Sequence, residues 1–353
     1  MTHREERKNA KDTILEESLR DFYLLRGLRF FAVKTKGDRM TIDFKTAAFV
    51  FPGQGSQAVG MGRDLAAAFP MAQQMFDEAD ALFGFSLSKL MWEGPAEELN
   101  DTVNTQPALF IHSLAAFRVF SHLHPDHRPA ALAGHSLGEL SALAASGALT
   151  FEDGLRLVRT RGELMKRAGE SAPGGMAAVL GLDIPALEKV CAEAGREGES
   201  VQVANDNCPG QVVVSGAKAA VERVIELAKA AGAKRAMPLA VSIAAHSSLM
   251  ASIQEEWNAA VQAVEMKDAE IPVVGNVHAK PMTAAADLRA DIMAQMQSRV
   301  RWTESVQWMS ANGIRSFIEV GSGSVLIGLI KRIAPSAVGQ ALGGPADFEA
   351  LGR

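Results

Sequence analysis

The sequence predicts an α/β protein in which a mostly parallel sheet lies among helices and carries a second, smaller domain. From residue 46 onward, short apolar runs alternate with longer helical stretches, a pattern typical of parallel strands joined by crossover helices. Residues 174–239 instead read as strand, helix, two strands, helix and strand. With 353 residues, 48% of them hydrophobic and 22% charged, the chain can bury a large core and a smaller companion.

Residues 1–39 differ in composition from the rest of the chain, because charged side chains are dense at both ends of the segment. An apolar strand is predicted to begin only at residues 40–44. We therefore expect residues 1–39 to be an N-terminal extension, native or produced by an upstream start, and Met40 to be the natural beginning of the folded protein.

The first strand of the large sheet is predicted at residues 47–51, and the glycine-containing loop 52–57 follows its carboxyl end. Ligands of open parallel sheets bind at the carboxyl ends of the strands. We expect this loop to border a site.

Residues 134–138 (Gly-His-Ser-Leu-Gly) place Ser136 between two glycines at a junction of strand and helix. Residues 129–133 are apolar and short, as in a buried strand, and residues 141–145 favour a helix. This arrangement is typical of a nucleophile elbow, in which the helix N-terminus offers free N–H groups to a developing oxyanion. It predicts an α/β-hydrolase-like large domain with a nucleophilic serine.

The smaller domain is predicted to have the element order βαββαβ, which is ferredoxin-like. Its strands are expected at residues 176–180, 201–204, 211–214 and 235–239, and its helices at 184–194 and 219–231. The resulting division is a large domain over 40–173 and 241–340, a small domain over 174–240, and a C-terminal tail over 341–353. A cleft between the two domains is the expected place for a site.

Several motifs are interpreted as structural. The histidines of residues 122–127 precede a strand and have no partner ligands elsewhere, so we expect no metal site. The glycine-rich residues 321–328 follow a strand at 317–320, but they lack the Walker lysine and are expected to open a helix. Cys191 and Cys208, the two cysteines of the chain, are expected to be small buried hydrophobic residues.

Charge and hydropathy exclude several classes of partner. A formal net charge of −5 argues against nucleic acid or an anionic membrane as the main ligand. The sequence has no run of about 18 uncharged apolar residues and begins without the apolar core of a signal peptide. We expect a cytoplasmic protein.

Five motifs occur in order along the chain, at residues 51–57, 134–139, 161–162, 205–211 and 245–247. Together they resemble the malonyl-CoA:acyl carrier protein transacylase family, which includes the acyltransferase domains of polyketide synthases. The resemblance extends from about residue 45 to residue 332. It implies ping-pong transfer of a malonyl group from malonyl-CoA to the phosphopantetheine thiol of holo acyl carrier protein, for fatty acid or polyketide synthesis, without a cofactor.

The resemblance implies that Ser136 is the acyl-accepting nucleophile and that His246 is its general base. His135, although adjacent to the serine, is expected to pack in the turn. In this family a backbone carbonyl orients the histidine, and the matching position is Gln295. The residues after Gln295 depart from the aromatic-Asn-Pro that is usual in the family, so a surface helical glutamine remains open.

Further positions of the family's site match residues of this chain. Backbone N–H groups of Gln54 and Leu137 would form the oxyanion hole. Arg161 would hold the free carboxylate of the acyl group through two hydrogen bonds. Asn205 and Asn207 would border the pantetheine tunnel, whereas the other arginines of the same helix, Arg159 and Arg167, are expected to be solvated.

The local sequence also bears on which acyl group is transferred and on where the carrier protein docks. Leu137 matches malonyl-type members, but residues 243–246 (Ile-Ala-Ala-His) match neither the malonyl-selective nor the methylmalonyl-selective pattern. Methylmalonyl-CoA or another acyl-CoA of a polyketide system therefore stays open, and a serine esterase is the remaining enzymatic alternative. For docking of an acidic carrier protein, basic candidates are Lys229, Lys234, Arg235, Arg299 and Arg301.

Overall fold

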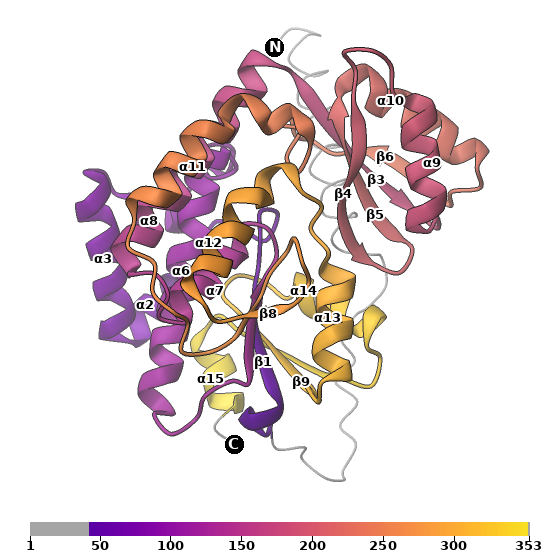
Figure 1. The fold of residues 1–353 in the computed structure, drawn as a ribbon. Coiled ribbons are helices and arrows are strands. Elements are labelled where there is room, and N and C mark those ends of the chain that lie inside the picture. Colours follow the sequence, from indigo (N-terminus) through magenta and orange to yellow (C-terminus); the bar gives the residue numbers. More distant parts are fainter. Residues whose placement is uncertain (1–41, 352–353) are drawn as a thin grey trace, which may run out of the picture.

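The structure is a computed structural model that describes residues 42–351, and it contains two sheets (Figure 1). The larger sheet has the strand order β10-β9-β1-β2-β7-β8. Neighbouring strands are parallel except at the β7–β8 edge, so the sheet is mixed and the predicted α/β class is confirmed. Its strands are β1 (Ala47–Phe51), β2 (Ala131–Gly134), β7 (Val273–Val274), β8 (Pro281–Met282), β9 (Ser316–Val320) and β10 (Val338–Leu342).

Strand β1 lies at the centre of this sheet and is buried along its whole length. Because side chains alternate between the two faces of a strand, Phe49 and Phe51 enter one core and Ala48 and Val50 enter another. The second core is covered by α13 (Trp302–Ala311) and α14 (Val325–Ile333).

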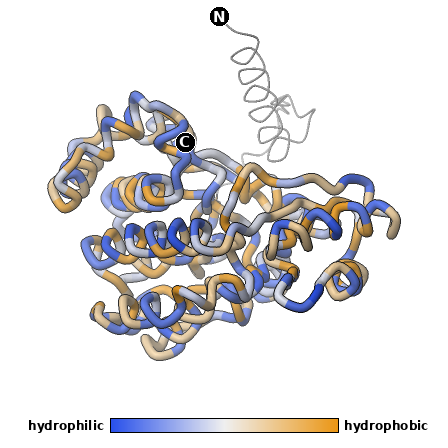
Figure 2. The backbone as a smooth tube through the Cα atoms, turned by 90° about the horizontal axis from the view of Figure 1, so that it is seen from above, coloured by the Kyte–Doolittle hydropathy of each residue, from blue (hydrophilic) through white to orange (hydrophobic). Residues whose placement is uncertain are grey.

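The first, larger core is covered by helices from the rest of the large unit. They are α2 (Arg63–Ala68), α3 (Pro70–Phe83), α4 (Leu87–Glu93), α5 (Ala96–Leu99), α6 (Thr102–Leu123), α7 (Gly138–Ala145), α8 (Phe151–Ser171), η2 (Ser248–Ile253), α11 (Gln254–Ala263), α12 (Ala285–Ala294), η3 (Gln295–Gln297) and α15 (Pro345–Leu351). Hydrophobic and hydrophilic positions alternate along the outer helices in Figure 2, as expected where one helix face is buried.

The smaller sheet is antiparallel throughout and has the order β4-β5-β3-β6. It consists of β3 (Gly174–Leu180), β4 (Val201–Cys208), β5 (Gln211–Ala217) and β6 (Arg235–Pro238), with α9 (Ile184–Ala194) and α10 (Lys218–Ala230) packed on one face. Figure 1 shows this unit at the upper right, beside the large sheet. The element order along the chain is the predicted one.

The two units are joined by more than the connecting chain. Strand β4 runs parallel to the segment before α13, where Asp206 N donates to Val300 O at 2.9 Å and Val300 N donates to Ala204 O at 2.8 Å. The hydroxyl of Thr303 adds a 2.6 Å hydrogen bond to the Asp206 carboxylate. These contacts fix β4 against the large unit and so position the face that carries Asn205 and Asn207.

Two parts of the sequence prediction differ from the structure at the chain ends. The strand expected at residues 40–44 is wrong over its described part, because Asp43 accepts a hydrogen bond from Lys45 N and caps a 3-10 turn, η1 (Phe44–Thr46). Residues 341–351, expected as a tail, complete β10 and form α15, where Phe348 is buried against the ring of Phe69. The predicted extension over residues 1–39 lies outside the described residues.

Within the described part of the chain, none of the helices is both long enough and apolar enough to cross a membrane.

Candidate active site

Ser136 lies at the turn between β2 and α7, with a positive φ of 53°. The tight approach of strand and helix requires glycine on both sides of it. A Cβ on Gly134 would come within 1.9 Å of Gly138 C, and one on Gly138 would come within 2.1 Å of Phe51 O. The predicted elbow geometry follows from this lack of side-chain volume, and it exposes the serine hydroxyl at the edge of the sheet.

The hydroxyl of Ser136 lies 2.8 Å from Nε2 of His246, although the two residues are 110 positions apart. His246 is 2% exposed and, with φ of 59°, also has left-handed backbone geometry. Its Nδ1 faces two backbone carbonyls, Gln295 O at 3.0 Å and Ser298 O at 3.2 Å. Because carbonyl oxygens only accept, the proton belongs on Nδ1, and Nε2 presents its lone pair to the serine.

The protonation of His246 is shifted toward the neutral form. Burial, followed by the positive charge of Arg161, lowers the pKa of this imidazole to about 3, against 6.5 for an ordinary histidine. A neutral imidazole beside a hydroxyl is the form that can accept its proton.

Arg161 extends from α8 to the same point and is 2% exposed. Its Nη1 donates to Gln106 Oε1 at 2.9 Å, and its Nη2 donates to Gln295 Oε1 at 2.8 Å and to Ser136 Oγ at 3.1 Å. Burial lowers the pKa of Arg161 to about 10, so the group remains a cation at neutral pH. Over residues 42–351 no carboxylate oxygen lies within 4.0 Å of it, and the charge has only neutral partners in the site.

These groups face a cavity of about 890 Å³ formed between the two units. The large unit contributes Ser136, Arg161, His246 and the 53–59 loop with Gln54, and the small unit contributes Asn205 and Asn207. The Gln54 side chain accepts a 3.0 Å hydrogen bond from Thr102 Oγ1, which anchors the loop, and Leu137 is buried at the start of α7. The structure thus brings together all the residues predicted for the site.

The side chain of His135, which also lines the cavity, bonds a residue of the small unit. Its Nε2 lies 2.8 Å from Asn207 Oδ1, and its ring lies edge-on to that of Trp302 with a centroid separation of 5.7 Å. Burial lowers the pKa of His135 as well. The expected packing role is consistent with these contacts, which also tie the elbow to β4.

Three polar residues of the site were missed at the sequence level: Gln106, Asn276 and Glu139. Asn276 clamps the elbow, since its Oδ1 accepts from Ser136 N at 2.8 Å and its Nδ2 donates to Gly134 O at 2.7 Å. Its signal in the sequence is its position just beyond the apolar pair of β7, at the carboxyl end of a strand. Gln106 lies within a helical run, where no comparable signal marks it. Glu139 belongs to the motif at 134–139, but the motif does not indicate its contacts.

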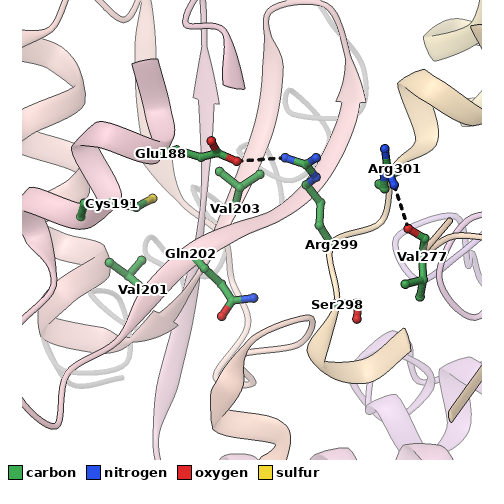
Figure 3. A pocket seen from close by; sticks show the side chains of 10 residues that line it. Glu188, Cys191, Val201, Gln202, Val203, Val277, Ser298, Arg299 and Arg301 are labelled. Carbon is green, nitrogen blue, oxygen red and sulfur yellow. Dashed lines mark hydrogen bonds and ion pairs between the residues drawn. The ribbon is translucent and has the colours of Figure 1, made fainter. Parts of the chain in front are cut away.

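The other arginines singled out from the sequence have separate partners. On α8, Arg167 bonds Glu256 at the surface, as expected. Arg159 bonds Glu163, but its side chain is 26% exposed and also donates to Val103 O, so it is less solvated than expected. Arg299 and Arg301 line a second cavity of about 600 Å³ that does not contain Ser136 (Figure 3). There Arg299 pairs with Glu188 of α9 at 3.2 Å, as the dashed line in Figure 3 shows.

The motifs interpreted as structural have structural contacts. The His127 ring packs on Phe44 with a centroid separation of 4.8 Å, and among residues 42–351 no cluster of three or more potential metal-ligating side chains is found. Both cysteines are buried, and burial raises the pKa of Cys191 to about 12 and of Cys208 to about 11. Helix α14 begins at Val325, directly after the glycine-rich turn.

A nucleophile elbow in an α/β sheet, a histidine whose Nδ1 faces two carbonyls and a buried arginine form a site that is suited to serine-dependent acyl transfer. Residues 48–341 match the family model described as acyl transferase domain, and the chain belongs to this family. It is 48% identical to the malonyl CoA-acyl carrier protein transacylase of Bacillus subtilis over 288 residues, which are 81% of this chain and 90% of that protein.

Solved structures agree in fold. The crystal structure of an acyl carrier protein S-malonyltransferase from Vibrio cholerae superposes with a TM-score of 0.84 at 45% identity, covering 87% of this chain and 99% of that one. A malonyl-transacylase solved in complex with a type II PKS acyl-carrier protein gives a TM-score of 0.84 at 42% identity, covering 86% and 98%.

Proposed function

We propose that the protein is a malonyl-CoA:acyl carrier protein transacylase, which moves a malonyl group from the thioester of malonyl-CoA to the phosphopantetheine thiol of a holo carrier protein. The observation that carries the proposal is the position of Arg161. A buried guanidinium without an acidic partner lies 3.1 Å from the nucleophile, as recognition of an acyl group that ends in a carboxylate requires. The names of the similar proteins point to the same substrate and partner.

In the first half-reaction, Ser136 Oγ attacks the thioester carbonyl while His246 Nε2 takes its proton. The carbonyl oxygen becomes an oxyanion, which we assign to the backbone N–H groups of Gln54 and Leu137. When the intermediate collapses, the C–S bond breaks and His246 returns the proton to the leaving thiolate. CoA leaves as the thiol, and the malonyl group remains as an ester of Ser136.

The second half-reaction runs in reverse with a different thiol. The phosphopantetheine thiol gives its proton to His246, its sulfur attacks the ester carbonyl, and His246 protonates Ser136 as the C–O bond breaks. Asn205 and Asn207 line the cavity from the small unit and would contact the pantetheine arm. Both half-reactions therefore use His246 as the base, and His246 ends each of them in the protonation state in which it began.

The orientation of His246 separates this mechanism from that of a serine esterase. Esterases with the same elbow pair the histidine with Asp or Glu, whereas Nδ1 of His246 faces the carbonyls of Gln295 and Ser298. We assign the orienting role to these two carbonyls.

We also propose the finer fold description that the sequence suggested. The antiparallel order β4-β5-β3-β6 with two helices on one face supports a ferredoxin-like small domain over residues 174–240. The elbow after β2 supports an α/β-hydrolase-like large domain over 40–173 and 241–340. A cytoplasmic location stays a prediction.

The test is transfer between purified components. The protein is incubated with malonyl-CoA and a phosphopantetheinylated carrier, with the unmodified carrier as the matched control, and carrier masses are measured. Only the phosphopantetheinylated form should gain a malonyl group. Release of malonate without a modified carrier would instead support the esterase. Equal transfer from methylmalonyl-CoA in a competition would broaden the substrate class.

A further inference from the structure

Behind the elbow lies a pair of carboxyl groups that the proposed cycle does not use. Glu139, on α7, is 1% exposed, and Asp291, on α12, is 0% exposed. The two side chains share a hydrogen bond. Because a hydrogen bond between two carboxyl groups needs one proton between them, at least one member of the pair is a neutral acid.

Both carboxyl groups also accept hydrogen bonds from N–H donors. Asp291 accepts from His278 Nδ1 at 2.7 Å and from Val277 N at 3.2 Å, and Glu139 Oε1 accepts from Asn276 N at 3.3 Å. Burial, followed by the charge of Asp291, raises the pKa of Glu139 well above its ordinary value. Glu139 is then the protonated member of the pair, and it donates to Asp291.

Glu139 connects to the acyl site through two donors, the Asn276 N–H at its Oε1 and the side-chain amide of Gln295 at its Oε2. The Nε2 group of Gln295 donates to Glu139 Oε2 at 2.6 Å and to Ser136 O at 2.9 Å. An amide nitrogen has two protons, so both are engaged, and the amide oxygen must face the opposite way. On that side it accepts from Arg161 Nη2 at 2.8 Å.

This arrangement determines the environment of the guanidinium. Arg161 is held between two amide oxygens, those of Gln295 and Gln106, and no ionised carboxylate competes with a ligand for its charge. An ionised Glu139 would stand one amide away and would offset that charge through space.

We infer that Glu139, through its hydrogen bond with the Gln295 amide, is a positioning residue for acyl-group selection. It orients the Gln295 amide so that Arg161 faces the cavity with its positive charge uncompensated. The inference rests on the proposed function, because it assumes that Arg161 binds the carboxylate of the malonyl group.

The experiment compares acylation by malonyl-CoA and by acetyl-CoA, which lacks the carboxylate. In Glu139→Gln, an amide carbonyl still accepts from Gln295 and an N–H replaces the O–H toward Asp291, so the malonyl-to-acetyl ratio of kcat/KM should stay within about threefold of the wild type. In Glu139→Leu the acceptor is lost, and the ratio should fall about tenfold or more while acylation by acetyl-CoA is retained.

Glu139→Asp, which withdraws the carboxyl by one methylene group, replaces the leucine variant if that variant fails to fold, and its ratio should fall by at least about threefold. Infrared spectra of the wild type should contain a carboxylic acid C=O band that Glu139→Gln lacks. Absence of that band, an unchanged ratio in the leucine or aspartate variant, or equal losses for both acyl groups that track a lowered Tm would overturn the inference.

Arg161→Ala separates failure of this inference from failure of the proposed function. Loss of the malonyl preference in Arg161→Ala, with an unaffected ratio in the Glu139 variants, would leave the function standing and remove only the role of Glu139. A ratio that Arg161→Ala does not change would contradict the proposed carboxylate binding itself.

Discussion

At the scale of single residues, the proposed base, His246, is neutral, and the proposed carboxylate-binding group, Arg161, is charged, although both are buried in the same site. Arg161 and His246 both contact the Ser136 hydroxyl, one as donor at 3.1 Å and the other at 2.8 Å. The positive charge of Arg161 disfavours protonation of His246. The arginine that would bind the substrate therefore also helps to keep the imidazole in the neutral form that can accept a proton.

The lowered pKa of His246 predicts an unusual pH profile for acylation. With the imidazole pKa at about 3, kcat/KM for malonyl-CoA in single-turnover acylation should stay level from pH 8 down to about 5, since the neutral base persists over that range. An inflection near 6.5, the ordinary histidine value, would contradict this assignment.

Folding must be monitored over the same pH range. Buried His112 and His135 also have lowered pKa values. The unfolded chain therefore binds more protons than the folded one below about pH 6.5, and these groups reduce stability as the pH falls. Tryptophan fluorescence at each pH distinguishes a titrating base from unfolding.

At the scale of elements, the site depends on how strands end. Ser136 follows β2, Asn276 follows β7 and the Gln54 loop follows β1, and all three lie at the carboxyl edge of the parallel strands. Helix α14 follows β9 at the same edge and lines the cavity with Val325, Leu326 and Leu329. Its position is fixed by a strand residue, because Glu319 Oε2 accepts from Ile327 N at 2.9 Å.

Glu319 predicts a pH-dependent contribution to stability. Burial raises its pKa from 4.5 to about 7, and it is 0% exposed. Between these values the folded protein keeps a proton that the unfolded chain has lost, so stability falls as the pH rises. Glu319→Gln removes this dependence, and its stability relative to the wild type should improve by about 3 kcal/mol between pH 4 and pH 8.

Urea unfolding of both proteins at the two pH values measures this difference. Glu97→Gln, at an exposed position of α5, is the matched control for the loss of one carboxyl group. A relative stability of the Glu319→Gln protein that does not change with pH would show that the folded state does not hold the proton.

Much of the secondary structure was predictable from the sequence, because the signals for each helix or strand lie in or beside the segment itself. The strand at 47–51 and the helix at 184–194 have the expected limits, because the first is a short continuous apolar run and the second follows an N-cap residue, Asp183. The roles of Gln106 and Glu139 were not predictable. They arise from hydrogen bonds to Arg161 and to Gln295, residues that are 55 and 156 positions away in the chain.

Gln295 likewise has contacts with distant residues that the local sequence does not predict. The sequence left a surface helical glutamine open, because nothing near residue 295 indicates burial. In the structure the residue is 1% exposed and uses its carbonyl toward His246 and its amide toward Arg161. These partners lie 49 and 134 positions away in the chain, and only the folded structure brings them to Gln295.

At the scale of the whole molecule, the cavity exists because β4 is held against the large unit beside Val300. A carrier protein must reach this cavity from the surface. Of the basic residues suggested for docking, Lys229, Arg299 and Arg301 are each paired with glutamates. Lys234 and Arg235 are exposed, and no ion pair to them is found among the described residues.

Charge reversal at Lys234 and Arg235 should therefore raise the apparent KM for an acidic carrier and leave acylation by malonyl-CoA unchanged. Exposed charges act on encounter and are screened over ~8–10 Å at ordinary salt, so the defect should shrink as ionic strength rises. Arg299→Glu, in the separate cavity, is the matched control. Equal slowing of both half-reactions would place docking elsewhere.

Ser136 is proposed to carry the malonyl group from the thiol of CoA to the thiol of the carrier protein. Intact-mass spectrometry of the protein after incubation with malonyl-CoA, before any carrier is added, tests it most directly. The wild type should gain the mass of one malonyl group and lose it when holo carrier is supplied, and Ser136→Ala should gain none. A malonyl adduct of full occupancy on Ser136→Ala would show that another residue carries the malonyl group.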